Sequence, residues 1–173
     1  MQALNRAVKA IPTEPILYIT AAKLQESHGD ITMVSKIISR AITKKLPENG
    51  VIIDRETWLK EAETAEKASP PMTETCRAIV AAVVDVAVDE RERKDTYHRD
   101  ADEAARRGSV HTARAILQHA CEVFPDSERS WRASAELEKA NGALLAVCCV
   151  VHSTAAARRC CLAVCCLSSR PLR

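Results

Sequence analysis

The sequence has little glycine, few aromatic residues and no long apolar run, and each scarcity excludes a class of function. Its four glycines lie far apart, at 29, 50, 108 and 142, so no phosphate-binding loop or dinucleotide-binding fingerprint is present. A Gly-x-Ser-x-Gly nucleophile elbow is also missing. The longest apolar stretch, residues 79–88, contains Asp85 and is shorter than the ~18 residues that a membrane span requires. We therefore expect no membrane partner, no small-molecule substrate and no cofactor.

Neither sign of charge predominates in the chain. Charged residues make up 28% of its 173 residues, but the formal net charge is only +2, so no large positive field favours direct nucleic-acid binding. The basic dipeptides at 44–45 and 106–107 are too short to form a nucleic-acid stripe. Residues 1–9 form an amphipathic pattern that lacks the apolar core of a secretory signal. These features predict a soluble intracellular protein.

What the sequence does contain is a repeated skeleton: an aromatic residue, a small alanine four positions later and a turn residue eleven positions later. Four of the five aromatic residues stand at the start of this skeleton, 40, 39 and 34 residues apart. Such spacings are typical of stacked helical repeats. The four copies are Tyr18/Ala22/Gly29, Trp58/Ala62/Ser69, Tyr97/Ala101/Gly108 and Trp131/Ala135/Gly142.

A second series of alanines follows the aromatics by 23 or 24 residues. It consists of Ala41, Ala82 and Ala120, with Ala7 in a truncated first copy. Small residues on both helices of a pair would let the backbones approach, and the aromatic would fill the gap between neighbouring pairs. Core packing is therefore the favoured role of the aromatics, and the alternative is that Trp58 or Trp131 is an exposed anchor for a partner.

A rival register rests on the tripeptide Arg-Ala-Ile, which begins at Arg40, Arg77 and Arg114 with an even spacing of 37 residues. It requires different distances from the aromatics. We therefore prefer the register of aromatics and alanines, and interpret the tripeptides as partly coincidental.

Apolar residues recur at helical spacing through residues 1–142. The first helix, residues 1–10, would bury a stripe of Leu4, Ala7, Val8 and Ile11. The segment 79–88 is rich in β-branched residues, but the repeat phase predicts that it is helical. Further helices are predicted over 15–28, 31–45, 54–69, 73–88, 95–108, 109–124 and 127–141, with 46–50 and 89–95 as connections. Their predicted N-caps are Thr13, Asp30, Asp54, Thr73, Asp95 and Ser109.

The strings between these fixed points resemble the half-a-tetratricopeptide repeats of RNA-processing scaffolds. Residues 16–26, 36–42 and 113–125 are the most similar, and the resemblance covers residues 1–142. It implies an all-α fold, a right-handed superhelical array of about three and a half antiparallel helix pairs, as in a tetratricopeptide-like α-solenoid. It also implies a nuclear splicing scaffold without catalysis that bridges components of the spliceosomal tri-snRNP. The implied partners are other spliceosomal snRNP proteins, with RNA contacted only indirectly.

Residues 143–173 depart from this family where another repeat helix should follow. They contain no acidic residue, four arginines and six of the eight cysteines, and we interpret them as a foreign tail, disordered or irregularly helical. A zinc site is the weaker alternative, because the spacing of Cys161 and Cys165 occurs once and the vicinal cysteine pairs cannot easily chelate together. Cys76 and Cys121 lie in helical patterns and are expected to be buried as small hydrophobic residues.

The remaining polar residues suggest no catalytic or metal site. His28, His98, His111 and His119 share no helical face, so we expect surface or loop histidines. An acid–base pair within 89–95 is less favoured than a solvated connection. The sequence therefore predicts a non-enzymatic protein–protein scaffold in pre-mRNA splicing. The alternatives are a generic tetratricopeptide-like adaptor or chaperone cofactor and, with least support, an RNA-binding repeat module. A groove lined by the first helices of the pairs would accept an extended or helical partner segment.

Overall fold

The computed structural model describes residues 2–142, which contain helices, turns and connections but no strand. The chain divides into two compact units, Met1–Arg93 and Lys94–Arg173, and each is described by itself. An all-helical fold is thus confirmed for the described part of the chain. The predicted tail at 143–173 and its alternative zinc site lie outside these residues.

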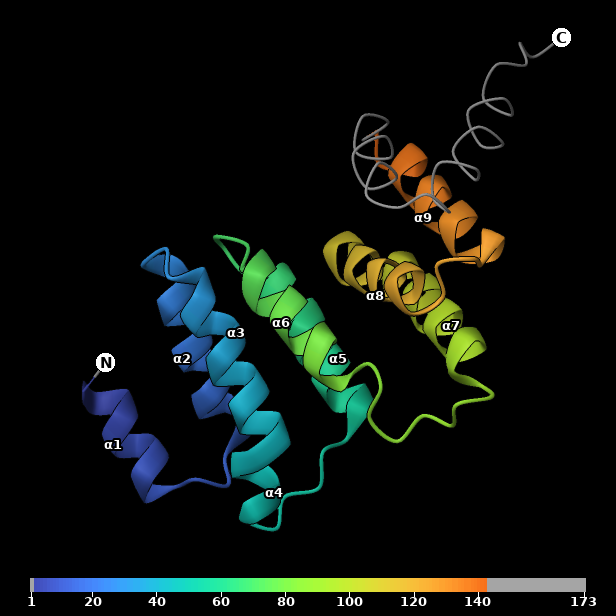
Figure 1. The fold of residues 1–173 in the computed structure, drawn as a ribbon. Helices are drawn as coiled ribbons and strands as arrows, with labels where there is room; N and C mark the ends of the chain where they lie inside the picture. Colours follow the sequence, from blue (N-terminus) through green and yellow to red (C-terminus); the bar gives the residue numbers. More distant parts are fainter. Residues whose placement is uncertain (1, 143–173) are drawn as a thin grey trace, which may run out of the picture. The chain divides into compact units, whose positions relative to one another are not determined.

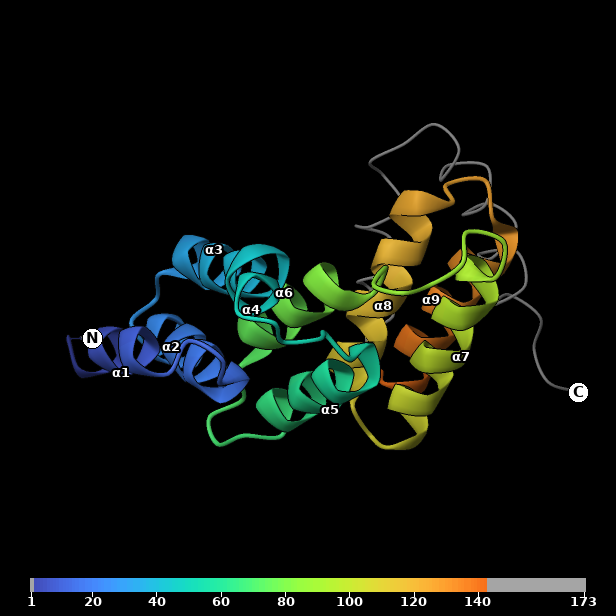
Figure 2. The ribbon, with the colours of Figure 1, turned by 90° about the horizontal axis from the view of Figure 1, so that it is seen from below.

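The first unit consists of helices that pack on one another in a row. Helix α1 packs on α2, α2 on α3, α3 on α6, and α6 on α5, as Figures 1 and 2 show. Thus α3 is covered by its own partner α2 and by α6 of the following pair. The helices are α1 (Gln2–Ala10), α2 (Pro15–Ser27), α3 (Ile31–Arg40), the π-helical turn η1 (Ala41–Lys45), α4 (Leu46–Glu48), α5 (Arg55–Glu66) and α6 (Thr73–Val83).

Short polar turns determine where the helices of this unit begin and end. Gly29 has φ +81°, a left-handed conformation that closes α2, and Asp30 then accepts a hydrogen bond from the Met33 amide as the N-cap of α3. Asp54 caps α5 in the same way, and its hydrogen bonds with Thr57 lower the pKa of its carboxyl group. Both predicted caps are therefore confirmed, whereas the predicted cap Thr13 is wrong because Glu14 precedes the first residue of α2.

The N-terminus of α6 is capped by a side chain from another helix pair. Glu26, near the end of α2, accepts hydrogen bonds from the amides of Glu74 at 2.8 Å and Thr75 at 2.7 Å, one on each carboxylate oxygen. A carboxylate suits this position because the first amides of a helix are unpaired and its dipole is positive there. Thr73, the predicted cap, is instead the first helical residue, after Met72.

Helix α6 confirms the helical prediction for the β-branched segment but ends earlier than predicted. It stops at Val83 rather than near Val88, and Ala87 has the positive φ of a turn. The Val84 carbonyl, left without a helical partner, accepts a hydrogen bond from Nε of Arg55 at 3.0 Å. Arg55 is the first residue of α5, so this contact fastens the end of α6 to the start of its partner helix.

The connection predicted at 46–50 is wrong at its first three residues, which continue the helical path of α3. The Leu46 amide bonds to the Ala41 carbonyl, five residues back, in the wider π-helical turn η1. The ring of Pro47 would clash with the carbonyl four residues before it in a regular α-helix. We attribute the wide turn to this conflict, since π turns relieve such clashes within helices.

The second unit contains three described helices: α7 (Arg93–Arg106), whose first residue ends the preceding unit, α8 (Val110–Val123) and α9 (Glu128–Ala140). The ring of Tyr97 on α7 packs edge-on against His119 and at a tilt against Phe124, with centroids 5.5 and 6.2 Å apart. Asp95 lies in the first turn of α7 and is not its cap, contrary to prediction. Ser109 takes the N-cap position of α8 as predicted.

The first three aromatic–alanine pairs of the skeleton are buried. Tyr18, Trp58 and Tyr97 lie in the core, as do Ala22, Ala62 and Ala101 four residues later. Trp131 and Ala135 are only half-buried. The turn residues Gly29, Gly108 and Gly142 all have positive φ, whereas Ser69 precedes a proline.

Two aromatics of the skeleton also make the same polar contact. The Tyr18 hydroxyl donates to the Pro12 carbonyl at 3.0 Å, and the Trp131 indole N–H donates to the Pro125 carbonyl at 2.8 Å, in each case six residues back. Burial raises the pKa of the Tyr18 hydroxyl, which favours its protonated, donating form. The six-residue spacing of proline and aromatic thus reflects a hydrogen bond that fixes the entry to a helix.

The second alanine series fits the structure at two of its three full positions. Ala41 and Ala120 are buried, but Ala82 is only half-buried, and its neighbour Val83 is fully buried on α6. Ala7, in the truncated copy, is half-buried on α1, where Ile11 is 55% exposed rather than part of the predicted apolar stripe.

Two of the three Arg-Ala-Ile tripeptides of the rival register begin at the same position within their helices. Arg77 is the fifth residue of α6 and Arg114 the fifth of α8, so these two tripeptides are equivalent in the structure. Arg40 stands at the end of α3 instead. The partly coincidental interpretation therefore applies to the Arg40 copy.

Replacement of Trp58 by alanine should destabilise the first unit. Trp58 is 4% exposed, and removing so large a buried ring costs roughly 3–5 kcal/mol through lost burial and a residual cavity. Thermal melting followed by circular dichroism should show a marked decrease in melting temperature. Trp131→Ala, at a half-buried site, should cost clearly less; equal losses would contradict the predicted core role of Trp58.

Replacement of Glu26 by glutamine should weaken the capping of α6. A glutamine has one acceptor oxygen and no charge, so the variant should lose about 1–2 kcal/mol of unfolding free energy. Urea denaturation measures the loss. Glu14→Gln at the other end of α2 is the matched control, because the Glu14 side chain makes no capping hydrogen bond. A similar loss in both variants would contradict the capping role.

Candidate partner-binding groove

A half-open groove lies in the first unit between α1, α2, α3 and η1. Its volume is about 330 Å³. Its apolar wall comes from all three helices and its remaining lining is basic. The lining residues are Val8 of α1, Tyr18 and Ala21 of α2, and Met33, Lys36, Ile37, Arg40, Ala41 and Lys45 of α3 and η1. Most of its lining therefore comes from α3 and η1, which follow α2 in the chain, whereas α2 contributes two residues and α1 one.

The groove is an apolar cavity with a cationic edge. Met33 is 36% exposed although it is apolar, and the three cations Lys36, Arg40 and Lys45 are exposed beside it. Within the described residues these three side chains form no ion pair or side-chain hydrogen bond. Neither α1 nor the segment 31–45 contains an acidic residue. The positive charge at this edge is thus uncompensated within those two elements.

The π-helical turn explains why one of these cations stands at the groove. In a regular α-helix, Lys45 would follow the buried Ala41 by four residues and share its inward face. The extra residue in η1 instead brings Leu46 into the core, where it is fully buried, and leaves Lys45 exposed. Sequence periodicity alone did not reveal this one-residue shift of the buried face from Lys45 to Leu46. Pro47 is the local sequence signal for it.

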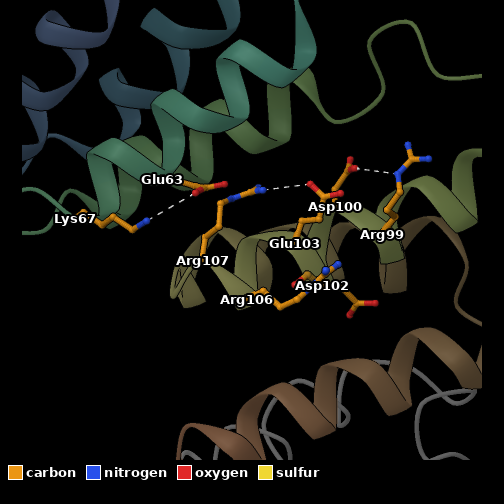
Figure 3. A network of polar contacts seen from close by, with 8 residues as sticks. All are labelled: Glu63, Lys67, Arg99, Asp100, Asp102, Glu103, Arg106 and Arg107. Carbon is orange, nitrogen blue, oxygen red and sulfur yellow. Dashed lines mark hydrogen bonds and ion pairs between the residues drawn. The ribbon is translucent and has the colours of Figure 1, made fainter.

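Charged side chains elsewhere mostly form short-range pairs along one helix. Lys67, just after α5, pairs with Glu63 of that helix, and Arg107, just after α7, pairs with Glu103 at 3.2 Å (Figure 3). Such exposed pairs contribute little to stability, roughly 0–1 kcal/mol each. Arg93, in the run 89–95, lies 3.8 Å from Asp85. Helix α7 begins at the last three residues of this run, so only part of the run is a connection.

Two polar clusters join α9 to the other helices of the second unit. Arg114 on α8 forms a two-pronged ion pair with Glu138, which is 5% exposed. His98 on α7 is 3% exposed, and its Nε2 lies 3.2 Å from the Ser130 hydroxyl, which donates to Ser127 Oγ. The expectation of surface or loop histidines is therefore wrong for His98. Tyr97 and Ala101, which lie beside His98 on the helix, belong to the repeat skeleton and are buried. Their position in the skeleton was the sequence signal for the burial of His98.

The environment of His98 disfavours its charged form. Burial lowers its pKa, and the positive charges of Arg129 and Lys94 act in the same direction, while Asp102 and Asp95 oppose them. Arg129 itself pairs with Asp95 across from α9 to α7. His98 is thus a buried residue of the second unit whose surroundings favour its neutral form.

Residues 2–142 show no arrangement of side chains typical of a metal site. No group of three or more His, Cys, Asp or Glu side chains in this region could hold a metal ion. Cys76 and Cys121 are buried free thiols, as predicted. Over the same residues, every helix is too short or too polar to span a bilayer. The exposed apolar groove with its basic edge is a feature of this part of the chain that is suited to binding.

These features define an all-helical class of protein built from short helix pairs, with an apolar groove and a basic edge in its first unit. No family model matches the chain. The chain is 42% identical over 106 residues to human pre-mRNA-processing factor 6, a match that covers 61% of this chain and 11% of that protein. It is 33% identical over 127 residues to pre-mRNA-splicing factor prp1 of Schizosaccharomyces pombe, covering 73% of this chain and 14% of the relative.

A plant protein is similar over a shorter stretch. Protein STABILIZED1 of Arabidopsis thaliana is 44% identical over 74 residues, which is 43% of this chain and 7% of that protein. The chain therefore contains a region similar to pre-mRNA-processing factor 6, and the resemblance inferred from its sequence is confirmed. It spans only about a tenth of the length of these curated relatives.

The buried His98 should make the second unit sensitive to acid. A histidine whose folded pKa lies below its unfolded value of about 6.5 stabilises the fold fully above that pH, and the stability is lost as the pH falls. Melting temperatures measured between about pH 7 and about pH 5 should fall more steeply for the wild type than for His98→Gln. The exposed His28 offers a control: His28→Gln should retain the wild-type slope, and identical slopes in all three proteins would contradict the prediction.

Proposed function

We propose that this chain acts in the nucleus as a protein–protein scaffold module in pre-mRNA splicing and helps to bridge components of the tri-snRNP. The main support is its similarity to proteins named as pre-mRNA-processing and pre-mRNA-splicing factors in two distant organisms. The helix-pair architecture is compatible with this role, because stacked pairs expose long surfaces for partner segments. Other spliceosomal snRNP proteins are the proposed partners, and RNA is contacted indirectly.

The alternatives predict different captured partners. A generic tetratricopeptide-like adaptor would retain chaperones, and an RNA-binding module would retain proteins only through RNA. Three of the four skeleton aromatics, Tyr18, Trp58 and Tyr97, are buried and offer little for base stacking, while Trp131 is half-buried. The scaffold role is therefore favoured over direct RNA binding.

Affinity capture from nuclear extract tests this function. The full chain is immobilised, and the retained proteins are identified by mass spectrometry with and without ribonuclease treatment. Spliceosomal snRNP proteins should be retained in both conditions, and an unrelated helical-repeat bait should not retain them. Loss of these proteins on ribonuclease treatment would support RNA binding instead, and enrichment of chaperones would support the adaptor.

A further inference from the structure

From the groove of the first unit we infer a more specific partner: an acidic amphipathic helix whose apolar side chains enter the groove while its carboxylates pair with the basic edge. This inference rests on the proposed function in so far as a scaffold needs a protein partner. It adds the chemistry of that partner and the place where it binds.

The shape of the groove favours anchoring side chains. A volume of about 330 Å³ accommodates a few apolar side chains, whereas a whole helix is about 10–12 Å across and must lie over the opening. The wall supplies suitable contacts from Val8, Met33 and Ile37. Amphipathic helices commonly bind such grooves through residues spaced at i, i+3, i+4 and i+7.

The charges at the edge favour an acidic partner. Lys36, Arg40 and Lys45 line the groove, and α1 adds Arg6 and Lys9, both exposed. No carboxylate occurs on α1 or in the segment 31–45 to offset them. A helix with glutamate or aspartate beside its apolar stripe would match this pattern, and the match would raise the association rate and the specificity of binding.

Two other occupants fit the groove less well. Single-stranded RNA binds through cationic grooves that also offer aromatic faces for stacking, but Tyr18 is 5% exposed and its hydroxyl donates to Pro12. The chain's own residues 143–173 contain four arginines and no acidic residue, so their charge does not complement the basic edge. A partner segment from another protein is therefore favoured.

Peptide binding to the full chain tests the inference by fluorescence anisotropy. The probe is a labelled synthetic helix of about 20 residues, with leucine at i, i+3, i+4 and i+7 and glutamate on the flanking positions. It should bind, and the affinity should decrease as salt is raised because exposed charges are screened. A scrambled peptide of the same composition and an oligouridylate RNA of similar length should bind much more weakly.

Two kinds of variant locate the site. The charge reversal Lys36→Glu, Arg40→Glu and Lys45→Glu should weaken peptide binding about tenfold or more. Met33→Gln, which changes the apolar wall without changing charge, should weaken it about threefold. The matched control reverses three exposed cations elsewhere, Lys60→Glu, Arg91→Glu and Lys139→Glu, and should change the affinity less than about twofold. Circular dichroism should show the same helix content in all variants.

Several results would overturn the inference: no peptide binding, equal binding of the scrambled peptide or the RNA, an equal effect of both charge reversals, or self-association through the groove in sedimentation experiments. The outcome is separable from that of the proposed function. Peptide binding at the groove with no splicing protein captured from nuclear extract would refute the function alone. Capture of splicing proteins that is unaffected by the groove variants, without peptide binding, would refute this inference alone.

Discussion

A short helix pair cannot bury its own apolar face, and this constraint governs the first unit. Helix α3 packs against both α2 and α6, and its core residues Val34 and Ile38 are fully buried in this stack of two pairs. The cap that Glu26 provides to α6 adds a directional contact to this apolar one. Stacking buries the pairs, and the carboxylate fixes their register, because its two oxygens must meet two particular amides.

The same constraint explains where a binding surface arises. A helix pair whose outer face is not fully covered by a neighbour leaves apolar side chains accessible, as Met33 is beside α1. In the first unit this face also holds cations that no acidic residue of α1 or of 31–45 neutralises. An array of pairs thus produces grooves as a consequence of its architecture, and local charge decides what each groove can accept.

Much of this fold could be predicted from spacing because the repeat skeleton has a direct physical meaning. The aromatics and the alanines that follow them occupy fixed places on the first helix of each pair, and the glycines close that helix. Even the separation of six positions from proline to aromatic has a cause, the hydrogen bond of Tyr18 to Pro12 and of Trp131 to Pro125. Caps such as Asp30 and Asp54 were predictable because their acceptors are local in sequence.

What sequence periodicity missed depends on contacts between distant residues or on a change of helical phase. The true cap of α6 is 48 residues away from the Glu74 amide it binds, so no local pattern around Thr73 could reveal it. Val83 replaces Ala82 in the core, and the alanine series could not show that exchange. The wide turn η1 changes the phase by one residue, so that Leu46 is buried and Lys45 reaches the groove. A proline near the end of a helix therefore helps to determine the charge of the surface, because it selects which side chain faces the core and which remains for a partner.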